Sequence, residues 1–401
     1  MSAVIPVAIG ARFVLSLSSV GDSLKRDHLL SSSLTSFPRL QEGIYLHESN
    51  IDPYSGGAFY QSPLFLLLFS TIYPLNSYSA RILWGICDII SAYLLIKIWR
   101  ARTNTRRETR ETMIAGAFIL NPYIFLPSLA LSTSAIENTL YLLAVSLACY
   151  KKRAPCLLTL AFLTHLSLPN ALLLPPLVLL LHGTPVSSLA SPKKSSIKYQ
   201  TFMRCVAEYL VYTFVLGVAC TISTGSTDWI VRTWGTSILL PDLRPNPGLW
   251  WYFFTEMFDH FRPFFLMVFS VHLLIYVAPI SIKFQHDPLY AVTLLQGILA
   301  TFKPYPTLAD IGLFLSTTSL FPEVYQHLRH PIVTALLHLH ASVLLPLFHS
   351  LWLTQGTGNA NFFYASTLVF GLANGAALID FVFAGLRLAF PVQKGSEITQ
   401  E

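Results

Sequence analysis

Residues 80–110 read ARILWGICDIISAYLLIKIWRARTNTRRETR, and the contrast between the two halves of this stretch decides the fold. Ala80 to Trp99 is an apolar run of the length that a helix needs to cross a bilayer core about 30 Å thick. The second half crowds basic residues into one short loop: Arg100, Arg102, Arg106, Arg107 and Arg110. An apolar run followed by clustered arginines is typical of a transmembrane helix that ends on the cytosolic side.

The same contrast extends over the whole chain. Of its 401 residues, 53% are hydrophobic and only 11% are charged, a composition that excludes an ordinary soluble globule. The net charge is +6, but the basic residues lie in loops between apolar runs and form no stripe with interleaved aromatic residues. We therefore read these charges as topology signals and expect no nucleic-acid partner.

Twelve apolar runs are candidate spans. They cover residues 4–20, 80–99, 112–131, 134–150, 156–168, 170–182, 205–223, 262–282, 289–303, 308–321, 332–352 and 362–386. This pattern predicts an all-α, polytopic membrane protein of about 12 transmembrane helices, with residues 1–401 as a single membrane domain. The first run lacks a basic leader and a cleavage site, so we expect a retained span and not a signal peptide.

The basic loops predict the sidedness. Loops 100–111, 151–155 and 183–204 and the tail 387–401 are expected to be cytosolic, as are both termini. Segments 21–79 and 224–261 then face the lumen. For the crossings to alternate, the run 61–74 must lie in the membrane plane or re-enter on the luminal side. The run 156–182 must be two short antiparallel helices, broken at its prolines.

The cysteines favour neither a disulfide framework nor a metal site. Cys87, Cys149, Cys156, Cys205 and Cys220 lie in or beside apolar runs, and none forms a C-x-x-C pair. We expect no metal and no cofactor. A nucleophilic cysteine would need a luminal histidine beside it, and none is expected there.

Polar residues are expected to gather at the luminal ends of the spans. Residues 249–262 (LWWYFFTEMFDHFR) predict an aromatic helix at the membrane interface, which either binds lipid or serves only as an anchoring belt. Lys303 and Asp310 flank a Pro-Tyr-Pro turn and are expected to form an ion pair. Asn359 and Asn361 open the last span, where capping is the ordinary role of asparagine and ligand binding is the alternative. Asp52-Pro53 is either a plain turn or part of the site.

Several of these motifs together resemble one protein family. They are Asp52 to Gly56 (DPYSG), Asn121 to Tyr123 (NPY), Pro241 to Leu243 (PDL), Phe254 to Phe261 (FTEMFDHF), Lys303 to Thr307 (KPYPT) and Asn359 to Ala365 (NANFFYA). In this order they resemble the class U subunit of glycosylphosphatidylinositol (GPI) transamidase. The resemblance implies a complex in the endoplasmic reticulum membrane that attaches a GPI lipid to the C-terminus of proteins. It further implies that a separate, cysteine-protease-like subunit of this complex is catalytic. The class U subunit is then the one that receives the lipid.

The chain is more distantly similar to the multi-span GPI mannosyltransferases, which implies a GT-C-like membrane fold with in-plane luminal helices. Those enzymes carry an acidic pair early in the first luminal loop. The corresponding residues here, 29–40, contain no carboxylate, and only Asp22, Asp27 and Glu42 flank them. Without paired acids, glycosyl transfer has no evident chemistry, which favours a non-catalytic binding protein.

The expected site residues fall into two groups. For GPI binding we expect Asn359, Asn361, Arg262, Arg244, Trp250, Phe254, Phe258, Glu256, His260 and Tyr364. For shaping the cavity we expect Asp52, Tyr54, Lys303, Tyr305 and Asp310. Three alternatives stay open: a mannosyltransferase that uses Asp27 or Glu42, a transporter that uses Asp88, Asp310 and Asp380, and a structural scaffold for the other subunits.

Overall fold

The computed structural model describes residues 4–192 and 197–390, and every regular element in these ranges is helical. The α-helices are α1 (Val4–Ser16), α2 (Ser19–Leu24), α3 (Phe37–Glu48), α4 (Pro63–Leu67), α5 (Ser77–Thr103), α6 (Glu108–Ile119), α7 (Pro122–Leu129), α8 (Ser134–Cys149), α9 (Arg153–Leu166), α10 (Leu174–His182), α11 (Tyr199–Thr224), α12 (Asp228–Leu239), α13 (Trp250–Glu256), α14 (Arg262–Leu274), α15 (Val277–Lys283), α16 (Pro288–Phe302), α17 (Leu308–Thr318), α18 (Pro331–Leu353) and α19 (Ala360–Ala389). Four short helices of other types join them: η1 (Leu68–Ile72), η2 (Leu168–Leu173), η3 (Asp259–Phe261) and η4 (Pro322–His327). The predicted all-α class is confirmed.

Five helical segments are long and apolar enough to cross a membrane: α5, α11, Asp259–Lys283, α18 and α19. The bent pair of α6 and α7 is a sixth. Seven shorter apolar helices of 10–17 residues follow, and all but Pro63–Ile72 correspond to the other six predicted spans. Length and composition therefore identify a membrane protein, with fewer long spans than the sequence predicts.

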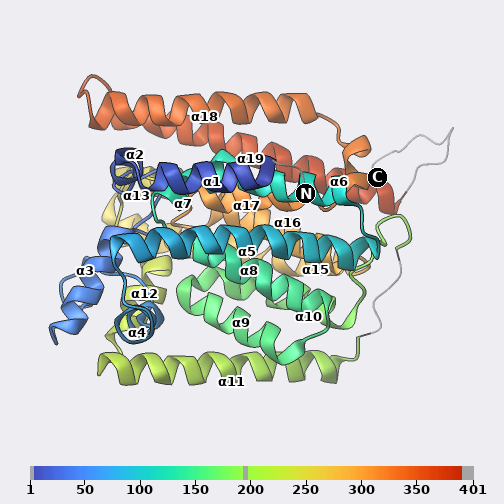
Figure 1. The fold of residues 1–401 in the computed structure, drawn as a ribbon, viewed down its shortest axis with the longest axis horizontal. Coiled ribbons are helices and arrows are strands. Elements are labelled where there is room, and N and C mark those ends of the chain that lie inside the picture. The colour runs from blue at the N-terminus through green and yellow to red at the C-terminus, as the bar shows by residue number, and fades with distance from the viewer. Residues whose placement is uncertain (1–3, 193–196, 391–401) are drawn as a thin grey trace.

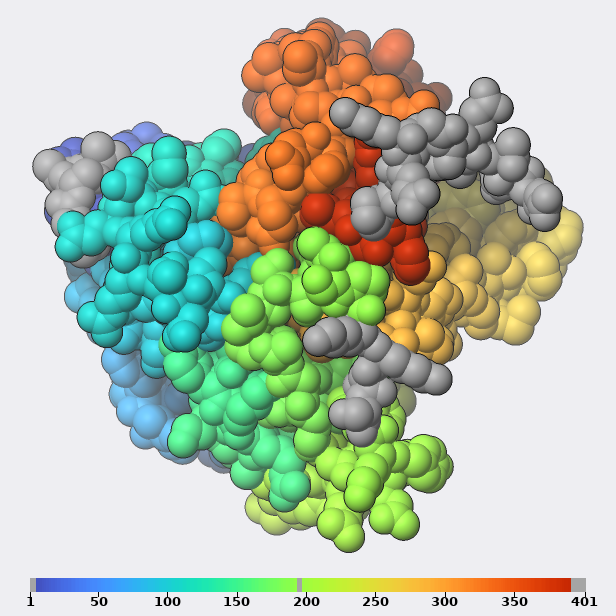
Figure 2. Space-filling view, turned by 90° about the vertical axis from the view of Figure 1, so that its right-hand side faces the viewer, coloured from blue at the N-terminus to red at the C-terminus, as the bar shows by residue number. Residues whose placement is uncertain are grey.

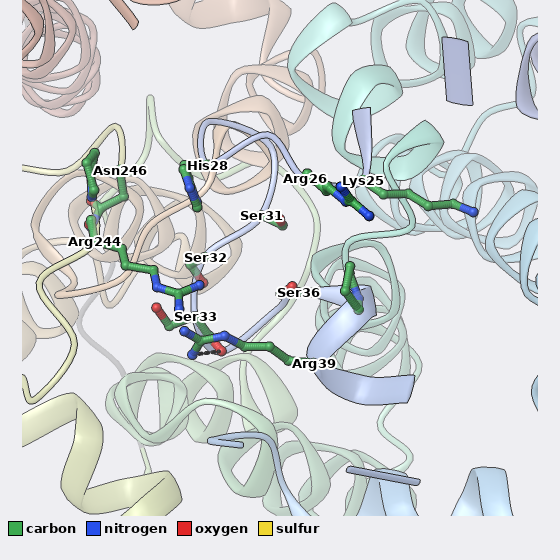
Figure 3. Close-up of a pocket in the computed structure, with 12 residues that line it drawn as sticks. Lys25, Arg26, His28, Ser31, Ser32, Ser33, Ser36, Arg39, Arg244 and Asn246 are labelled. Carbon is green, nitrogen blue, oxygen red and sulfur yellow. Dashed lines mark hydrogen bonds between the residues drawn. The ribbon is translucent and has the colours of Figure 1, made fainter. Parts of the chain in front are cut away.

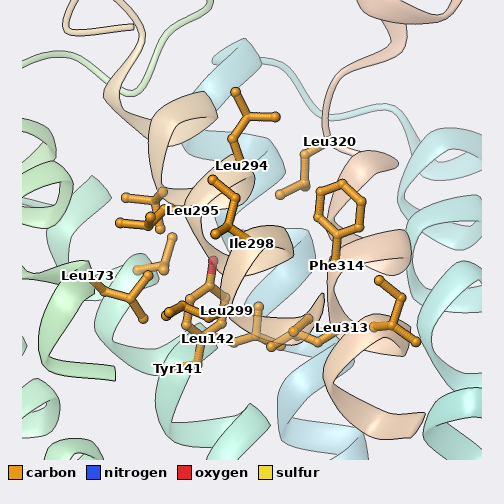
Figure 4. Close-up of a cluster of buried hydrophobic side chains, with 14 of the residues drawn as sticks. Tyr141, Leu142, Leu173, Leu294, Leu295, Ile298, Leu299, Leu313, Phe314 and Leu320 are labelled. Atoms are coloured by element: carbon orange, nitrogen blue, oxygen red, sulfur yellow. The ribbon is translucent and has the colours of Figure 1, made fainter. Parts of the chain in front are cut away.

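The core forms around α16. Its residues from Pro288 to Thr301 are all buried, so this mostly apolar helix is enclosed by its neighbours on every side. Figure 4 shows side chains of α16, among them Leu295 and Ile298, packed against Tyr141 of α8 and Phe314 of α17. At 15 residues, α16 is about 22 Å long, less than a bilayer core, which a helix tolerates when protein surrounds it.

The long helices run side by side, and several of the short ones gather at one end (Figure 1). At the right-hand end of that view lie the C-termini of α5 and α19 and the N-termini of α11 and α18, which adjoin basic segments. At the left-hand end lie α2, α3, α4, α12 and α13. Helix α4 is drawn nearly end-on while α5 and α11 run across the view, so it lies crosswise to them, as expected for the in-plane run 61–74.

The run 156–182 reverses direction as predicted. Lys151, just before α9, donates a hydrogen bond of 2.6 Å to the carbonyl oxygen of Leu180, near the end of α10. The chain therefore returns to the end from which it started. The break lies at Ser167, between α9 and η2.

Two predicted helices are not continuous. The expected span 112–131 consists of α6 and α7, bent by 51° at their junction, because Pro122 cannot continue a helix from residue 118. The expected aromatic helix over 249–262 ends at Glu256, and an extended Met257 separates it from η3. The first span is also shorter than 4–20, since α1 ends at Ser16.

Two buried carboxylates within the bundle, Asp88 and Asp380, have polar partners. Arg12 and Asp88 form an ion pair of 2.7 Å, and both side chains are almost fully buried. Asp380 accepts hydrogen bonds from the backbone amides of Arg329 and His330 at 2.6 and 3.0 Å. These pairings explain how such groups are tolerated in an apolar bundle.

Three helical segments stand out from this bundle. In Figure 2, viewed from the end with the basic segments, α18 (orange), the segment of α14 and α15 (gold) and α11 (yellow-green) project from the body. Helix α18 buries only Ala341 and Leu345, and α14 only Leu273. Their apolar surfaces are therefore available to lipid or to other membrane helices.

Candidate functional site

The predicted site residues meet where α13 packs on the first turns of α19. The hydroxyl of Tyr364 donates to the carbonyl oxygen of Leu249 at 3.3 Å, and the rings of Tyr252 and Tyr364 are 4.6 Å apart. Trp251 packs against Phe363 with ring centroids 5.7 Å apart. Helix α13 lies at the end of the bundle opposite the basic segments (Figure 1). These contacts place residues 249–256 and the start of α19 on one surface.

Asn359 and Asn361 have different environments. The side chain of Asn359 accepts a hydrogen bond of 3.1 Å from the amide of Phe362, so Asn359 is the N-cap of α19. Asn361 is exposed, and its side-chain oxygen accepts a hydrogen bond from the hydroxyl of Tyr252. This bond leaves both N–H donors of the Asn361 amide for a ligand.

The aromatic residues of α13 point inward. Trp250 and Phe254 are each 2% exposed, and the indole Nε1 of Trp250 donates to the carbonyl oxygen of Phe302 at 2.8 Å. The expectation that these two residues pack against a lipid is corrected: they pack against protein, because α13 turns its aromatic face into the bundle. Phe258, beyond the break in the helix, is 72% exposed and is the one of the three that offers an open ring.

A polar edge surrounds Phe258. Glu256, Asp259 and His260 are all exposed. The ring of His260 lies 4.0 Å from that of Phe261 and 5.9 Å from that of Phe258, measured between centroids. This edge combines hydrogen-bonding groups with aromatic faces, a combination that suits sugars and lipid headgroups.

Arg262 lies at the junction of α12 and α14. It donates to the carbonyl oxygen of Leu240 at 2.6 Å and lies over the ring of Phe254 at 5.6 Å. Cations near the last carbonyls of a helix are stabilising, so Arg262 also caps α12. No carboxylate among the described residues forms an ion pair with Arg262. Within the part of the chain that the structure describes, no ion pair neutralises its positive charge.

An apolar groove of about 570 Å³ opens beside Arg262, between α12 and α14. Arg262 and Asp259 lie at its polar end. Its apolar lining includes Ile238, Leu239, Leu266, Met267, Val271 and Leu274. A groove with a cation at one end and an apolar length suits an amphiphile with an acidic headgroup and a hydrocarbon chain.

Arg244 is held only loosely. Its side chain is 57% exposed, and its Nε lies 3.7 Å from a carboxylate oxygen of Asp242. That carboxylate has two closer partners, Arg39 at 2.7 Å and the hydroxyl of Ser33 at 2.9 Å. Burial alone would raise the pKa of Asp242, but the hydrogen bond and charge of Arg39 hold it below its ordinary value.

The turn after α16 contains the predicted ion pair. The Nζ of Lys303 lies 2.5 Å from a carboxylate oxygen of Asp310, and both residues are buried. The second carboxylate oxygen accepts from the amide of Thr307, at the start of α17. The hydroxyl of Tyr305 accepts a hydrogen bond of 3.2 Å from the amide of Asp242. The turn therefore supports the loop that leads to α13.

Asp52 and Tyr54 belong to another part of the protein. Asp52 accepts a hydrogen bond of 3.0 Å from the amide of Tyr54, which confirms the plain turn. Tyr54 is buried in a cluster with Phe37, Phe59 and Trp84, separate from the core that contains Trp250 and Phe363. The structure does not bring this pair together with the two asparagines.

Two features escape the sequence analysis. Tyr252, the partner of Asn361, is one aromatic residue among many in its segment, and no local signal distinguishes it. The groove between α12 and α14 depends on how residues 238–239 and 262–274 approach one another, which spacing alone does not reveal. The apolar face of 262–274 beside Arg262 is the one signal that points to it.

The fold and the site together define the class of protein: a helical membrane protein with a surface suited to an amphiphilic ligand at one end of the bundle. The comparisons then identify the family. The model of the family described as GPI transamidase subunit PIG-U matches residues 6–370. The chain therefore belongs to the PIG-U family of GPI transamidase subunits.

Curated relatives agree along nearly the whole chain. GPI transamidase component GAB1 of Saccharomyces cerevisiae is 33% identical over 378 residues, which cover 93% of this chain and 90% of the yeast protein. Its homolog in Schizosaccharomyces pombe is 34% identical, with 91% and 88% covered. GPI-anchor transamidase component PIGU of Homo sapiens is 30% identical, with 99% and 96% covered. These relatives support a subunit role in GPI anchoring.

Proposed function

We propose that this chain is the subunit of GPI transamidase that binds the GPI lipid and presents it for attachment to proteins in the lumen of the endoplasmic reticulum. The observation that carries the proposal is Arg262, a cation that lies at the polar end of an apolar groove and forms an ion pair with none of the described carboxylates. A GPI lipid combines hydrocarbon chains, a phosphodiester and a glycan. The groove and its surroundings offer a matching partner for each of these parts.

The proposed arrangement follows the chemistry of the surface. An acyl chain lies along α14 between Leu266 and Leu274, and the phosphodiester meets Arg262. Helix α13 leads from there to Asn361, since Arg262 approaches the carbonyl oxygen of Phe254 and Tyr252 holds Asn361. The glycan lies over Phe258, His260 and the free amide of Asn361. Arg244 is a further phosphate ligand at the edge of this surface.

We further propose that the chain is not catalytic and that a cysteine-protease-like subunit performs the transamidation. All five cysteines are free and buried, away from any aqueous substrate. The mannosyltransferase alternative would need Asp27 or Glu42. Asp27 accepts a hydrogen bond from the backbone amide of Leu29 in a turn. Glu42 is exposed on α3, and none of the other described acidic residues is paired with it. Neither residue suggests an acidic pair around a metal or a proton.

The proposed topology retains twelve crossings. The six long or bent spans and six of the seven shorter apolar helices make up this number, with Pro63–Ile72 in the membrane plane. The end with basic segments is cytosolic, both termini are cytosolic, and segments 21–79 and 224–261 are luminal. The arrangement is the GT-C-like one that the resemblance implies, within a single membrane domain.

A scaffold role is a second candidate, and the exposure of three helices favours it. The spans α11, Asp259–Lys283 and α18 bury few of their residues, so they offer apolar faces to other subunits. The two roles make different predictions. Substitutions on these faces, such as Leu336→Arg on α18, should release partner subunits, whereas substitutions at Asn361 or Arg262 should leave assembly intact and reduce lipid retention.

The test of lipid binding uses cells that lack the endogenous subunit and express variants of this chain. Alanine at both Asn359 and Asn361 should lower surface display of a GPI-anchored reporter and the amount of GPI that co-purifies with the complex. Co-precipitation of the other subunits is the control for assembly. Unchanged attachment and unchanged GPI retention in the double variant would refute the site.

A further inference from the structure

A second pocket lies beside the proposed site and is strongly basic. It has a volume of about 160 Å³ and is formed by residues 25–39 and the loop 244–246. Its lining contains no carboxylate: Lys25, Arg26, His28, Ser31, Ser32, Ser33, Ser36, Pro38, Arg39, Arg244, Pro245 and Asn246. Figure 3 shows Arg39 and Arg244 reaching in from opposite sides beside Ser32 and Ser33. Residues 29–40 are the stretch in which the sequence shows no acid.

The charge of this pocket is only partly neutralised. Arg39 and Arg244 share one carboxylate, that of Asp242, at 2.7 and 3.7 Å. Arg26 is exposed and forms no ion pair among the described residues. Lys25 pairs with Asp22 and points away in Figure 3, so it is not counted. Two guanidinium groups on one carboxylate leave an excess positive charge at the centre of the pocket.

Several hydrogen-bond donors of the pocket remain free for an acceptor atom of a ligand. Arg39 is 7% exposed and has five N–H donors, of which two make hydrogen bonds, to Ser33 and Asp242. Ser36 precedes α3, but its side chain caps none of the helix amides and makes no other described hydrogen bond. The positive end of α3 adds to the field of the arginines. These donors approach one small volume from several directions.

The uncharged residues around the pocket are also compatible with a hydrogen-bond acceptor bound there. Burial, the nearby His349 and the charge of Arg244 lower the pKa of His28, so this ring is neutral near pH 7 and does not add a repelling or attracting charge. Ser31, Ser32 and Ser33 are buried and use their hydroxyls within the protein, on Asp27, Thr35 and Asp242. The loop is therefore fixed before any ligand arrives.

We propose that this pocket is an anion site that binds the phosphate of a phosphate ester. A tetrahedral phosphate offers oxygens to Arg39, Arg244 and Ser36 at the same time, whereas a planar carboxylate satisfies only one fork. The phosphate comes either from a lipid-linked headgroup or from a soluble phosphomonoester. The ring of His28 lies 6.1 Å from that of His349, which lies 5.3 Å from Phe363 of α19. The pocket is therefore within reach of a headgroup held at the proposed site, with which it shares Arg244, but it lies apart from Arg262 and the groove along α14.

The experiment measures modification of arginines by phenylglyoxal in the purified complex, with each modified peptide quantified by mass spectrometry. Arg244 is exposed and should react readily. Phosphoethanolamine in solution is one arm, and micelles that contain phosphatidic acid are the other. We expect at least threefold slower modification of Arg244 in one or both arms. Protection in the micelle arm alone identifies a lipid source, and protection by phosphoethanolamine identifies a soluble or terminal phosphate.

Two controls make the result specific. Arg232, on α12 and outside the pocket, should react equally with and without ligand at constant ionic strength. Arg39→Lys keeps a cation beside Asp242 but loses the guanidinium fork, so it should abolish protection of Arg244 while the complex stays folded. Equal protection of Arg232 and Arg244, or no protection in either arm, overturns the proposal. Neither result bears on a GPI lipid bound along α14, which labelling near Phe258 tests separately.

Discussion

The hydroxyl of Tyr252 donates a hydrogen bond to the side-chain oxygen of Asn361, 109 positions further along the chain. This bond joins α13 to the first turn of α19 and fixes which end of the asparagine amide points outward. Two residues earlier, the side-chain oxygen of Asn359 caps the helix. The two asparagines of one motif therefore have separate roles, and substitutions can distinguish them.

Removing the Tyr252 hydroxyl tests the orientation of Asn361. In Tyr252→Phe the ring contacts remain, but the amide of Asn361 is free to rotate, so GPI retention should fall several-fold, the effect of one hydrogen bond. The measurement is the amount of GPI that co-purifies with the complex. Because Tyr252 is partly exposed, thermal stability should not change. Full GPI retention in this variant would show that the bond is incidental.

Substitutions should separate the capping role of Asn359 from the ligand contact of Asn361. Asn359→Ala removes an N-cap and should destabilise α19 by about 1 kcal/mol, whereas Asn359→Ser should restore most of that loss. Asn361→Ala should leave the unfolding midpoint unchanged and lower GPI attachment. Thermal unfolding of the purified variants and surface display of a GPI-anchored reporter measure the two effects. An Asn359→Ser variant that is stable yet inactive would assign ligand binding to Asn359 as well.

The ion pair after α16 should be structural. Lys303→Met leaves the Asp310 carboxylate buried without its cation, which should destabilise the protein by about 3–5 kcal/mol. Asp310→Asn should cost a similar amount, because the charge of Lys303 is then unpaired. The double variant Lys303→Met/Asp310→Asn should recover a large part of the loss. Additive losses in thermal unfolding would show that the two charges do not interact.

Asp242 should make the free energy of unfolding depend on pH in the acidic range. Its pKa in the folded state lies below the ordinary 3.8, so its contribution is fully present above that value and is lost as the pH falls through the folded-state pKa. Asp242→Asn leaves Arg39 without its partner at neutral pH and should cost about 3 kcal/mol there. The difference in stability between wild type and variant should shrink below pH 3.8. A constant difference at all pH values would contradict the ion pair with Arg39.

Much of the fold follows from the apolar runs and prolines. The reversal within 156–182 and the crosswise helix near Pro63 are predicted from parity, and the structure contains a reversal and a crosswise helix there. The break in 156–182 lies at Ser167, however, and Pro175 and Pro176 do not interrupt the second helical segment. The predicted span 112–131 is present as the bent pair of α6 and α7, and Pro122 explains the bend of 51° at their junction. The short run 289–303 is among the candidate spans, and the structure shows why so short an apolar helix is stable: its neighbours bury α16 along almost its whole length.

The site was predicted less completely. Composition places aromatic and polar residues in 249–262. It does not tell which residues of this segment face the bundle and which face outward, because the helix breaks at Met257. Trp250 and Phe254 are therefore buried, and Phe258 is not. The basic pocket was missed because Arg39 and Arg244 lie 205 positions apart and converge only through Asp242. Such long-range pairs have no signature in a single sequence.

The most direct test of lipid binding is photo-crosslinking with a reactive GPI analogue in membranes that contain the whole complex, with adducts mapped to residues. Adducts on this chain at Phe258 to Met267 and near Asn361 are the predicted result, and Ser270→Trp, which fills the groove, should reduce them. Arg232→Gln, outside the groove, is the matched control and should leave the adducts unchanged. Adducts confined to other subunits would contradict the central claim and leave this chain as a scaffold.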